Sequence, residues 1–214
     1  NQCGKENCIY ATEIRNLGLD GMKAVFHFPE CTKEVEIPIP GEHNVLNALA
    51  GACVGMELGL DVEQICAGIK QTIGGRTNLI HANDMLIIDD CYNANPVSMR
   101  TSIDILTQAK GRMIAVLGDM GELGADEKRL HYEVGAYAAS RGLDALFCCG
   151  ELSKELAKGA KEHSETMEIF YFATKEELLL HLKSYLKKGD TILVKASHFM
   201  EFPDIVRSLQ ASVQ

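Results

Sequence analysis

The sequence has no long hydrophobic run and no excess of basic charge. Its most apolar stretch, residues 45–56, is interrupted by Asn47 and is far shorter than the roughly 20 residues that span a bilayer. We therefore expect no membrane insertion. With 30 acidic against 21 basic side chains, the formal net charge is -9. Because a surface of that sign repels phosphate backbones, we also expect no nucleic acid among the partners.

Cysteine pairs with the spacing of a metal or redox site are missing too. The eight cysteines are scattered, and no two of them are separated by two residues, so the sequence contains neither half of a zinc ribbon nor a Cys-x-x-Cys redox motif. Several lie in apolar runs, namely Cys53, Cys66, Cys148 and Cys149. We predict buried, reduced thiols and no metal ligands in this chain.

A length of 214 residues allows one large domain or two small ones. The 46% of hydrophobic and 24% of charged residues are typical of a folded protein. The chain begins at Asn1 without an initiator methionine or a signal-peptide pattern, so we expect it to be part of a longer protein.

The first part of the chain predicts a β-meander followed by two helices. Strand-like patterns separated by turn residues occupy 9–17, 22–28 and 35–39. Over 43–60, apolar residues recur every three or four positions, which is typical of one helix face. A second helix, 62–73, is predicted to follow an Asp61 cap.

After residue 75, short apolar runs alternate with helical patterns. The runs are 85–88, 113–117, 145–149, 169–172 and 191–194. The helical patterns are 97–109, 127–141, 152–163, 175–186 and 202–209. This alternation predicts an α/β fold with a mainly parallel sheet covered by helices. We place the boundary near residues 79–84, which gives domains of 1–80 and 81–214.

In a parallel sheet, ligands bind at the carboxyl ends of the strands. The stretch 89–96 (Asp-Asp-Cys-Tyr-Asn-Ala-Asn-Pro) follows the first buried run and carries two carboxylates and two amide side chains that precede a helix. Such carboxylates can accept hydrogen bonds from ribose hydroxyls or hold Mg²⁺. Asn95 followed by Pro96 is also the usual start of a helix, so a cap and a ligand role both stay open.

Three other places could meet a ligand. Residues 118–124 (Gly-Asp-Met-Gly-Glu-Leu-Gly) could bring backbone N–H groups near a phosphate, but a tight strand-to-helix turn is the simpler interpretation. Near a helix start, His43, Asn44 and Asn47 share adjacent faces, where amides can pair with a heterocyclic base or cap the helix. Arg76 suits either an anion contact or a solvated linker.

The last apolar run leads into 195–198 (Lys-Ala-Ser-His), where Lys195 and Ser197 add a cation and a hydroxyl to the same sheet edge. We discount hydrolysis, because no Gly-x-Ser-x-Gly motif is present. His131 lies in a helical stretch, and we interpret it as a packing residue rather than a base.

Five stretches in the same order resemble the Mur ligase family. They are 41–50 (Gly-Glu-His-Asn-Val-Leu-Asn-Ala-Leu-Ala), 75–76 (Gly-Arg), 89–99 (Asp-Asp-Cys-Tyr-Asn-Ala-Asn-Pro-Val-Ser-Met), 117–124 (Leu-Gly-Asp-Met-Gly-Glu-Leu-Gly) and 130–135 (Leu-His-Tyr-Glu-Val-Gly). The His-Asn-x-x-Asn stretch resembles the whole superfamily. The Tyr-Asn-Ala-Asn-Pro and Gly-Asp-Met-x-Glu-Leu-Gly stretches are similar to the branch that uses D-alanyl-D-alanine.

The resemblance implies that residues 1–80 are the end of the family's central ATPase domain and that 81–214 form its C-terminal Rossmann-like domain. The chain contains no Gly-Lys-Ser or Gly-Lys-Thr. The phosphate loop, the lysine that the family carbamylates for a second Mg²⁺ and the acceptor-binding domain are therefore expected outside it, and the chain alone is expected to be inactive.

The implied activity is the ATP- and Mg²⁺-dependent ligation of D-alanyl-D-alanine to UDP-N-acetylmuramoyl-tripeptide through an acyl phosphate. This step of peptidoglycan precursor synthesis is expected in the cytoplasm, from a monomer. The resemblance implies adenine contacts for His43, Asn44 and Asn47, a ribose bond for Asp90, a γ-phosphate contact for Arg76, phosphate-side or catalytic roles for Tyr92 and Asn95, and substrate binding for Asn93, Asn95, Ser98, Lys195 and Ser197.

Two departures from the family pattern stand out. The last strand usually ends Lys-Gly-Ser-Arg, where this chain has Ala196 and His198, and Gly121 stands where a larger apolar residue is common. Two alternatives remain: a sister ligase such as a folylpolyglutamate synthetase, which usually has Asp-Gly-Ala-His-Asn-Pro in place of the stretch that ends at Pro96, and a non-catalytic nucleotide-binding module.

Overall fold

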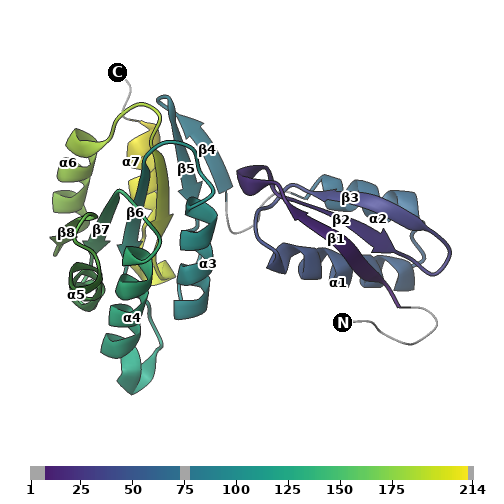
Figure 1. The fold of residues 1–214 in the computed structure, drawn as a ribbon, viewed down its shortest axis with the longest axis horizontal. Coiled ribbons are helices and arrows are strands. Elements are labelled where there is room, and N and C mark those ends of the chain that lie inside the picture. Colours follow the sequence, from purple (N-terminus) through teal and green to yellow (C-terminus); the bar gives the residue numbers. More distant parts are fainter. Residues whose placement is uncertain (1–7, 73–77, 212–214) are drawn as a thin grey trace. The chain divides into compact units, whose positions relative to one another are not determined.

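The computed structural model describes residues 8–72 and 78–211 of the chain (Figure 1). By compactness the chain divides into two units, Asn1–Gly74 and Gly75–Gln214. This division falls a few residues before the boundary expected at 79–84. The reason is that residues 79–84 belong to a hairpin of the second unit's sheet.

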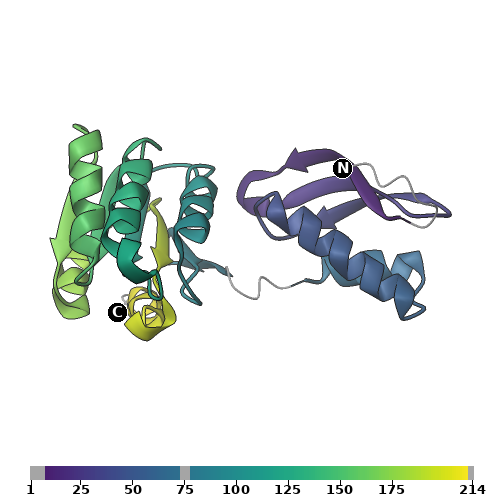
Figure 2. The ribbon, with the colours of Figure 1, turned by 90° about the horizontal axis from the view of Figure 1, so that it is seen from below.

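The first unit is a three-stranded antiparallel sheet covered on one face by two helices (Figure 2). Alternate residues of the middle strand, Met22, Ala24 and Phe26, are buried against the helices with Val45 and Ile65. The elements are β1 (Tyr10–Asn16), β2 (Met22–His27), β3 (Thr32–Ile37), α1 (His43–Glu57) and α2 (Val62–Lys70), with a 3₁₀ turn at Gly18–Asp20.

The predicted Asp61 cap of α2 is confirmed. Its carboxylate accepts the N–H of Gln64 at 2.7 Å, and the Gln64 side chain accepts the N–H of Asp61 at 3.0 Å. This reciprocal pair satisfies two of the backbone donors that a helix start leaves without partners. The helix ends at Lys70, earlier than the predicted 73.

The second unit contains a six-stranded sheet in the order β4-β5-β9-β6-β7-β8. Only β4 is antiparallel to its neighbour, so the expected mainly parallel sheet is confirmed. The five predicted runs are all strands, and β4 was not predicted. The strands are β4 (Asn78–Ala82), β5 (Met85–Asp89), β6 (Met113–Gly118), β7 (Ala145–Cys149), β8 (Glu168–Phe172) and β9 (Thr191–Lys195).

Helices cover both faces of this sheet (Figures 1 and 2). On one face, α6 and α7 pack against a core that includes Ile87, Val116, Phe147 and Val194. The helices α3, α4 and α5 cover the other face, as right-handed crossovers require. The helices are α3 (Pro96–Leu106), α4 (Glu127–Ala139), α5 (Ser153–His163), α6 (Lys175–Tyr185) and α7 (Pro203–Gln210), with 3₁₀ turns at Gly124–Asp126 and His198–Met200.

The position of β9 between β5 and β6 creates a switch point in the sheet. The chain leaves β5 and β6 for helices on one face, and it leaves β9 for α7 on the other. In open α/β sheets, such a reversal opens a crevice at the carboxyl ends of the strands, where ligands bind.

Candidate functional site

The loops that follow β5, β6 and β9 enclose a hollow of about 440 Å³ at this switch point. Volumes of this size are ordinary for ligand sites. The lining residues are Tyr92 and Asn93 after β5, Gly121 and Glu122 after β6, and Ser197, His198 and Phe199 after β9.

Ser197 holds the three loops together. Its Oγ accepts the N–H of Gly121 at 2.8 Å and donates to the carbonyl of Ala94 at 3.2 Å. Its own N–H donates to the carbonyl of Asp119 at 3.0 Å. Because the hydroxyl proton is directed at Ala94 and the N–H at Asp119, Ser197 can offer a ligand at the hollow only oxygen acceptors.

Asp90 and Lys195 meet beneath the hollow, at the ends of β5 and β9. The Nζ of Lys195 lies 2.7 Å from Oδ2 of Asp90, and the exposed fractions of the two residues are 2% and 7%. Such a buried lysine cannot reach a substrate with its ammonium. This differs from the substrate-binding role expected for Lys195.

Asn95 and Ser98 form the cap of α3. The Asn95 side chain accepts the N–H of Ser98 at 2.9 Å, and Oγ of Ser98 lies 3.1 Å from both the N and the carbonyl oxygen of Asn95. Pro96 occupies the first helical position. Of the two roles that the sequence left open for Asn95, the structure thus shows the helix cap. The Ser98 hydroxyl is hydrogen-bonded within this cap.

The loop after β6 is fixed by two buried side chains. Asp119 accepts the N–H of Ser153 at 2.7 Å and its Oγ–H at 2.6 Å, so it caps α5 rather than facing a ligand. His131 has no exposed surface, and its Nε2 accepts the N–H of Met120 at 2.8 Å. The packing role predicted for His131 is confirmed.

Three residues that line the hollow received no role from the sequence: Glu122 and His198, which lie in the candidate segments 118–124 and 195–198, and Phe199, which lies outside them. Glu122 has a left-handed backbone with φ of 60°, which is uncommon for a residue other than glycine and often marks a functional loop. Its position in a loop directly after a buried strand was the available signal.

Two of the departures from the family pattern, Gly121 and Ala196, each lie against a neighbouring residue of matching size. A Cβ added to Gly121 would lie 3.0 Å from Cε1 of Phe199, so this ring occupies space that a larger residue would need. Likewise, a Cβ added to Gly118 would lie 2.7 Å from Cβ of Ala196, so the Ala196 methyl is accommodated by a glycine.

Cys91 is unsuited to act as a nucleophile. Its Sγ donates to the carbonyl of Val194 at 3.3 Å, and the thiol is buried. Burial raises the pKa of Cys91 strongly, and the neighbouring carboxylates of Asp89 and Asp90 add to the rise. The thiol therefore stays protonated at neutral pH.

In the first unit, the predicted adenine contacts are adjacent at the start of α1. The amide of Asn44 donates to the carbonyl of Pro40 at 2.9 Å, and that of Asn47 donates to Oδ1 of Asn44 at 3.0 Å. Both line a hollow of about 330 Å³ beside Ala48. The exposed His43 ring is close to Gly41, where an added Cβ would lie 2.7 Å from its Cε1. Arg76 lies outside the described residues.

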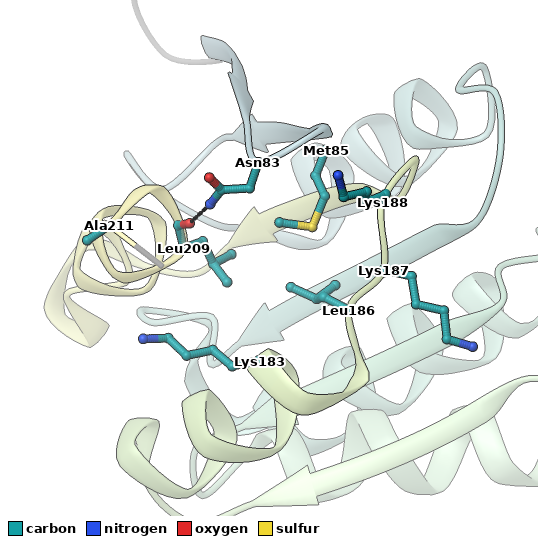
Figure 3. Close-up of a pocket in the computed structure, with 8 residues that line it drawn as sticks. All are labelled: Asn83, Met85, Lys183, Leu186, Lys187, Lys188, Leu209 and Ala211. Atoms are coloured by element: carbon teal, nitrogen blue, oxygen red, sulfur yellow. Dashed lines mark hydrogen bonds between the residues drawn. The ribbon is translucent and has the colours of Figure 1, made fainter. Parts of the chain in front are cut away.

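A larger hollow, about 550 Å³, lies at the opposite, amino ends of the strands. Lys183, Lys187 and Lys188 line it, but Figure 3 shows that their ammonium groups do not converge on one point. Lys188 is paired with Asp84 at 2.7 Å. Within residues 8–72 and 78–211, no group of three His, Cys, Asp or Glu side chains could hold a metal ion.

Comparison with known proteins identifies the family of the chain. The family model described as "Mur ligase, glutamate ligase domain" matches residues 75–198. The chain belongs to the Mur ligase family, as its motifs predicted. The helices that the structure describes include none long and apolar enough to cross a membrane.

Particular members of this family are similar over most of the chain. UDP-N-acetylmuramoyl-tripeptide–D-alanyl-D-alanine ligase of Bacillus subtilis (strain 168) is 38% identical over 178 residues, 81% of this chain and 39% of that protein. MurF from Acinetobacter baumannii matches with a TM-score of 0.87 and 33% identity, over 97% of this chain and 46% of that one. MurF ligase from Thermotoga maritima in complex with ADP matches with a TM-score of 0.74 and 25% identity, over 94% and 46%. The chain thus spans about two fifths of the length of the curated relatives it matches.

Proposed function

We propose that the protein containing this chain joins D-alanyl-D-alanine to UDP-N-acetylmuramoyl-tripeptide with ATP, and that this chain supplies the end of its ATPase domain and its C-terminal domain. The observation that carries the proposal is the switch-point hollow, where the two family stretches around Asp90 and Gly121 meet the loop after β9 that contains Ser197. The similarity to ligases that are named for this activity supports it.

The reaction has two steps. The tripeptide carboxylate attacks the γ-phosphorus of ATP, which gives an acyl phosphate and ADP. The amine of D-alanyl-D-alanine then attacks the acyl carbon, an amide forms, and phosphate and a proton leave. Catalysis of this kind depends mainly on positioning the reactants and excluding water.

Residues of both units are assigned to ATP in this proposal. Asn44 and Asn47, with His43, bind adenine, Asp90 accepts the ribose hydroxyls, and Arg76 approaches the γ-phosphate. The paired amides of Asn44 and Asn47 and the strand-end position of Asp90 fit these roles. An ion such as Mg²⁺ would neutralise phosphate charge, but we assign no Mg²⁺ ligand within the described residues.

The 440 Å³ hollow is assigned to the reacting end of the substrates. Tyr92 is exposed and Asn93 lines the hollow beside it, so both can contact the acyl phosphate or the incoming amine. Asn95 and Ser98 support the loop as the cap of α3 and can present their remaining polar atoms. Ser197 offers its hydroxyl oxygen as an acceptor. We further propose that the enzyme acts in the cytoplasm as a monomer.

The test is phosphate release by the full-length protein with ATP, Mg²⁺ and UDP-N-acetylmuramoyl-tripeptide, with and without D-alanyl-D-alanine. Release should require the dipeptide and should fall at least about tenfold in Asp90→Ala and Arg76→Ala, because each loses a charged contact to ATP. Release driven by another amino acid would assign a sister ligase. No release with any amine would support a binding module.

A further inference from the structure

The ammonium of Lys195 is enclosed by acceptors from a single loop. Its Nζ lies 2.7 Å from Oδ2 of Asp90, 2.8 Å from the carbonyl oxygen of Asn93 and 3.4 Å from that of Asp90. An ammonium has three N–H donors, so these three oxygens account for all of them. At 2% exposure, the side chain is wholly inside the second unit.

The carboxylate of Asp90 is held from a second side. The Oγ of Ser102, on α3, lies 2.5 Å from the same Oδ2 that Lys195 contacts and 2.8 Å from the carbonyl oxygen of Ser98, and Ser102 is 3% exposed. The two contacts therefore come from different elements, β9 and α3, and converge on one oxygen. Rotation of the carboxylate would break both of them.

Stability alone is a weak reason for this arrangement. Burying an ammonium and a carboxylate removes both from water, and apolar side chains of similar size often serve the fold equally well. A fixed carboxylate, in contrast, loses little conformational freedom when a ligand binds to it. The arrangement thus favours a binding role in which the orientation of Asp90 matters.

We propose that Lys195 and Ser102 are positioning residues that hold the Asp90 carboxylate ready to accept the ribose hydroxyls of the nucleotide. Through the Asn93 carbonyl, Lys195 also fixes the loop that lines the 440 Å³ hollow. One ammonium therefore couples the nucleotide site to the site of the second substrate, whereas Ser102 acts on the nucleotide site alone. This inference rests on the proposed function, because it takes the ribose contact of Asp90 from it.

The experiment compares ATP with 2′-deoxy-ATP and 3′-deoxy-ATP in the full-length protein, using kcat/KM for phosphate release. Hydrogen bonds between a hydroxyl and a carboxylate predict that the wild-type protein prefers ATP by about 10- to 100-fold over at least one deoxy analogue. In Ser102→Ala and in Lys195→Met this preference should fall to less than about threefold. A general loss of stability would lower both rates and leave the ratio unchanged.

Thr101→Ala is the matched control, because the Thr101 hydroxyl, like that of Ser102, donates to the carbonyl four residues earlier on α3, in this case that of Val97. It should keep the wild-type preference. The KM for D-alanyl-D-alanine should rise in Lys195→Met but not in Ser102→Ala. Should Lys195→Met fail to fold, the nucleotide preference of Ser102→Ala decides alone.

The outcomes separate the two proposals. A wild-type protein that releases no phosphate with any amine argues against the proposed function. A wild-type protein that ligates but distinguishes ATP from neither deoxy analogue overturns the ribose role of Asp90, and the positioning proposal with it. Full wild-type preference in Ser102→Ala and in folded Lys195→Met overturns the positioning proposal alone.

Discussion

At the scale of single residues, His131 shows how one side chain can fix a loop. Its Nε2 accepts the N–H of Met120, so the ring proton is on Nδ1, which donates to the carbonyl of Glu127 at 2.7 Å. The ring is neutral in this arrangement, because a proton on Nε2 would face the Met120 N–H. His131 therefore ties the loop after β6 to the first turn of α4.

We predict that His131→Ala lowers the free energy of unfolding of the second unit by about 2–4 kcal/mol. The change leaves the buried N–H of Met120 without its acceptor and opens a cavity. His163→Ala is the control, since His163 is exposed. Its Nδ1 lies 2.9 Å from the carbonyl of Gly159, four residues earlier, just as Nδ1 of His131 lies near the carbonyl of Glu127. The control should cost less, about 0.5–1 kcal/mol, because it loses only the edge contact of its ring with Tyr132. Urea denaturation of both variants measures the difference, and equal effects would contradict the prediction.

The buried thiols of the second unit predict a loss of stability at alkaline pH. Burial raises the pKa of Cys149 from its ordinary 9.0 to about 11, with Asp119 adding to the rise, and burial raises the pKa of Cys148 as well. Above about pH 9 the unfolded thiols lose protons that the folded protein retains. The stability contribution is therefore complete below pH 9 and is lost as the pH rises through about 11.

Denaturant midpoints between pH 8 and 11 measure this effect. Tyrosines also titrate in this range, so the informative quantity is the difference between the wild-type chain and Cys149→Ala. We expect the variant to lose stability less steeply above pH 9. Parallel curves over the whole range would show that Cys149 does not contribute.

At the scale of elements, α4 and α5 cross at two glycines. A Cβ on Gly135 would lie 1.9 Å from the carbonyl oxygen of Leu156, and one on Gly159 would lie 2.1 Å from that of Tyr132. Each glycine thus provides the space that the backbone of the other helix fills. No rotamer change can relieve such an overlap, because the obstructing atoms are backbone.

Gly135→Ala should therefore destabilise the second unit by about 2–3 kcal/mol, although alanine is the better helix former. Gly68→Ala, in α2 of the first unit, is the contrasting variant, because an added Cβ there meets no atom within 4 Å. It should stabilise its own unit by about 0.5–1 kcal/mol. Thermal unfolding followed by circular dichroism shows whether each variant is less stable or more stable than the wild-type chain. A neutral Gly135→Ala would mean that the helices separate at little cost.

How far the sequence predicts these elements depends on burial. The strands β5 to β9 were predictable, since runs that are apolar on both faces have few alternatives. In contrast, β4 has one neighbour only and no buried residue, so its pattern is weak. The turn residues Asn83 and Asp84 both have φ of 58°, as in the left-handed turn of a tight hairpin. Asparagine and aspartate tolerate this backbone, so the Asn-Asp pair was a usable sequence signal for the hairpin of β4 and β5.

The site was predictable to the level of the loop, but not to the level of the contact. Loops after buried strands pointed to Asp90 and Ser197. The pairing of Asp90 with Lys195 depends on β9 lying beside β5, with Asp89 opposite Val194, and no local pattern encodes that order. For the same reason, the sequence could not show that Lys195 is enclosed while Phe199 lines the hollow.

At the scale of the whole molecule, each of the two units encloses a hydrophobic core of its own. The core of the first unit is built from β2, β3, α1, α2 and Phe28. In the second unit, one core lies between the six-stranded sheet and the helices α6 and α7. Every strand of the six-stranded sheet lies after Gly75, so the hydrogen-bonded ladder is complete within the second unit. A single domain of this size has enough interior to fold alone.

We predict that residues 75–214, expressed alone, fold into the second unit and unfold in one cooperative transition. Matching far-ultraviolet and near-ultraviolet circular dichroism transitions would demonstrate this, because a collapsed chain without fixed packing retains the first signal and loses the second. Gly135→Ala should lower the midpoint in the fragment as it does in the 214-residue chain, since Gly135 and Leu156 both belong to the fragment. A fragment that lacks the near-ultraviolet signal would mean that the second unit needs the first for its packing. The separate core of each unit would then not be sufficient for folding.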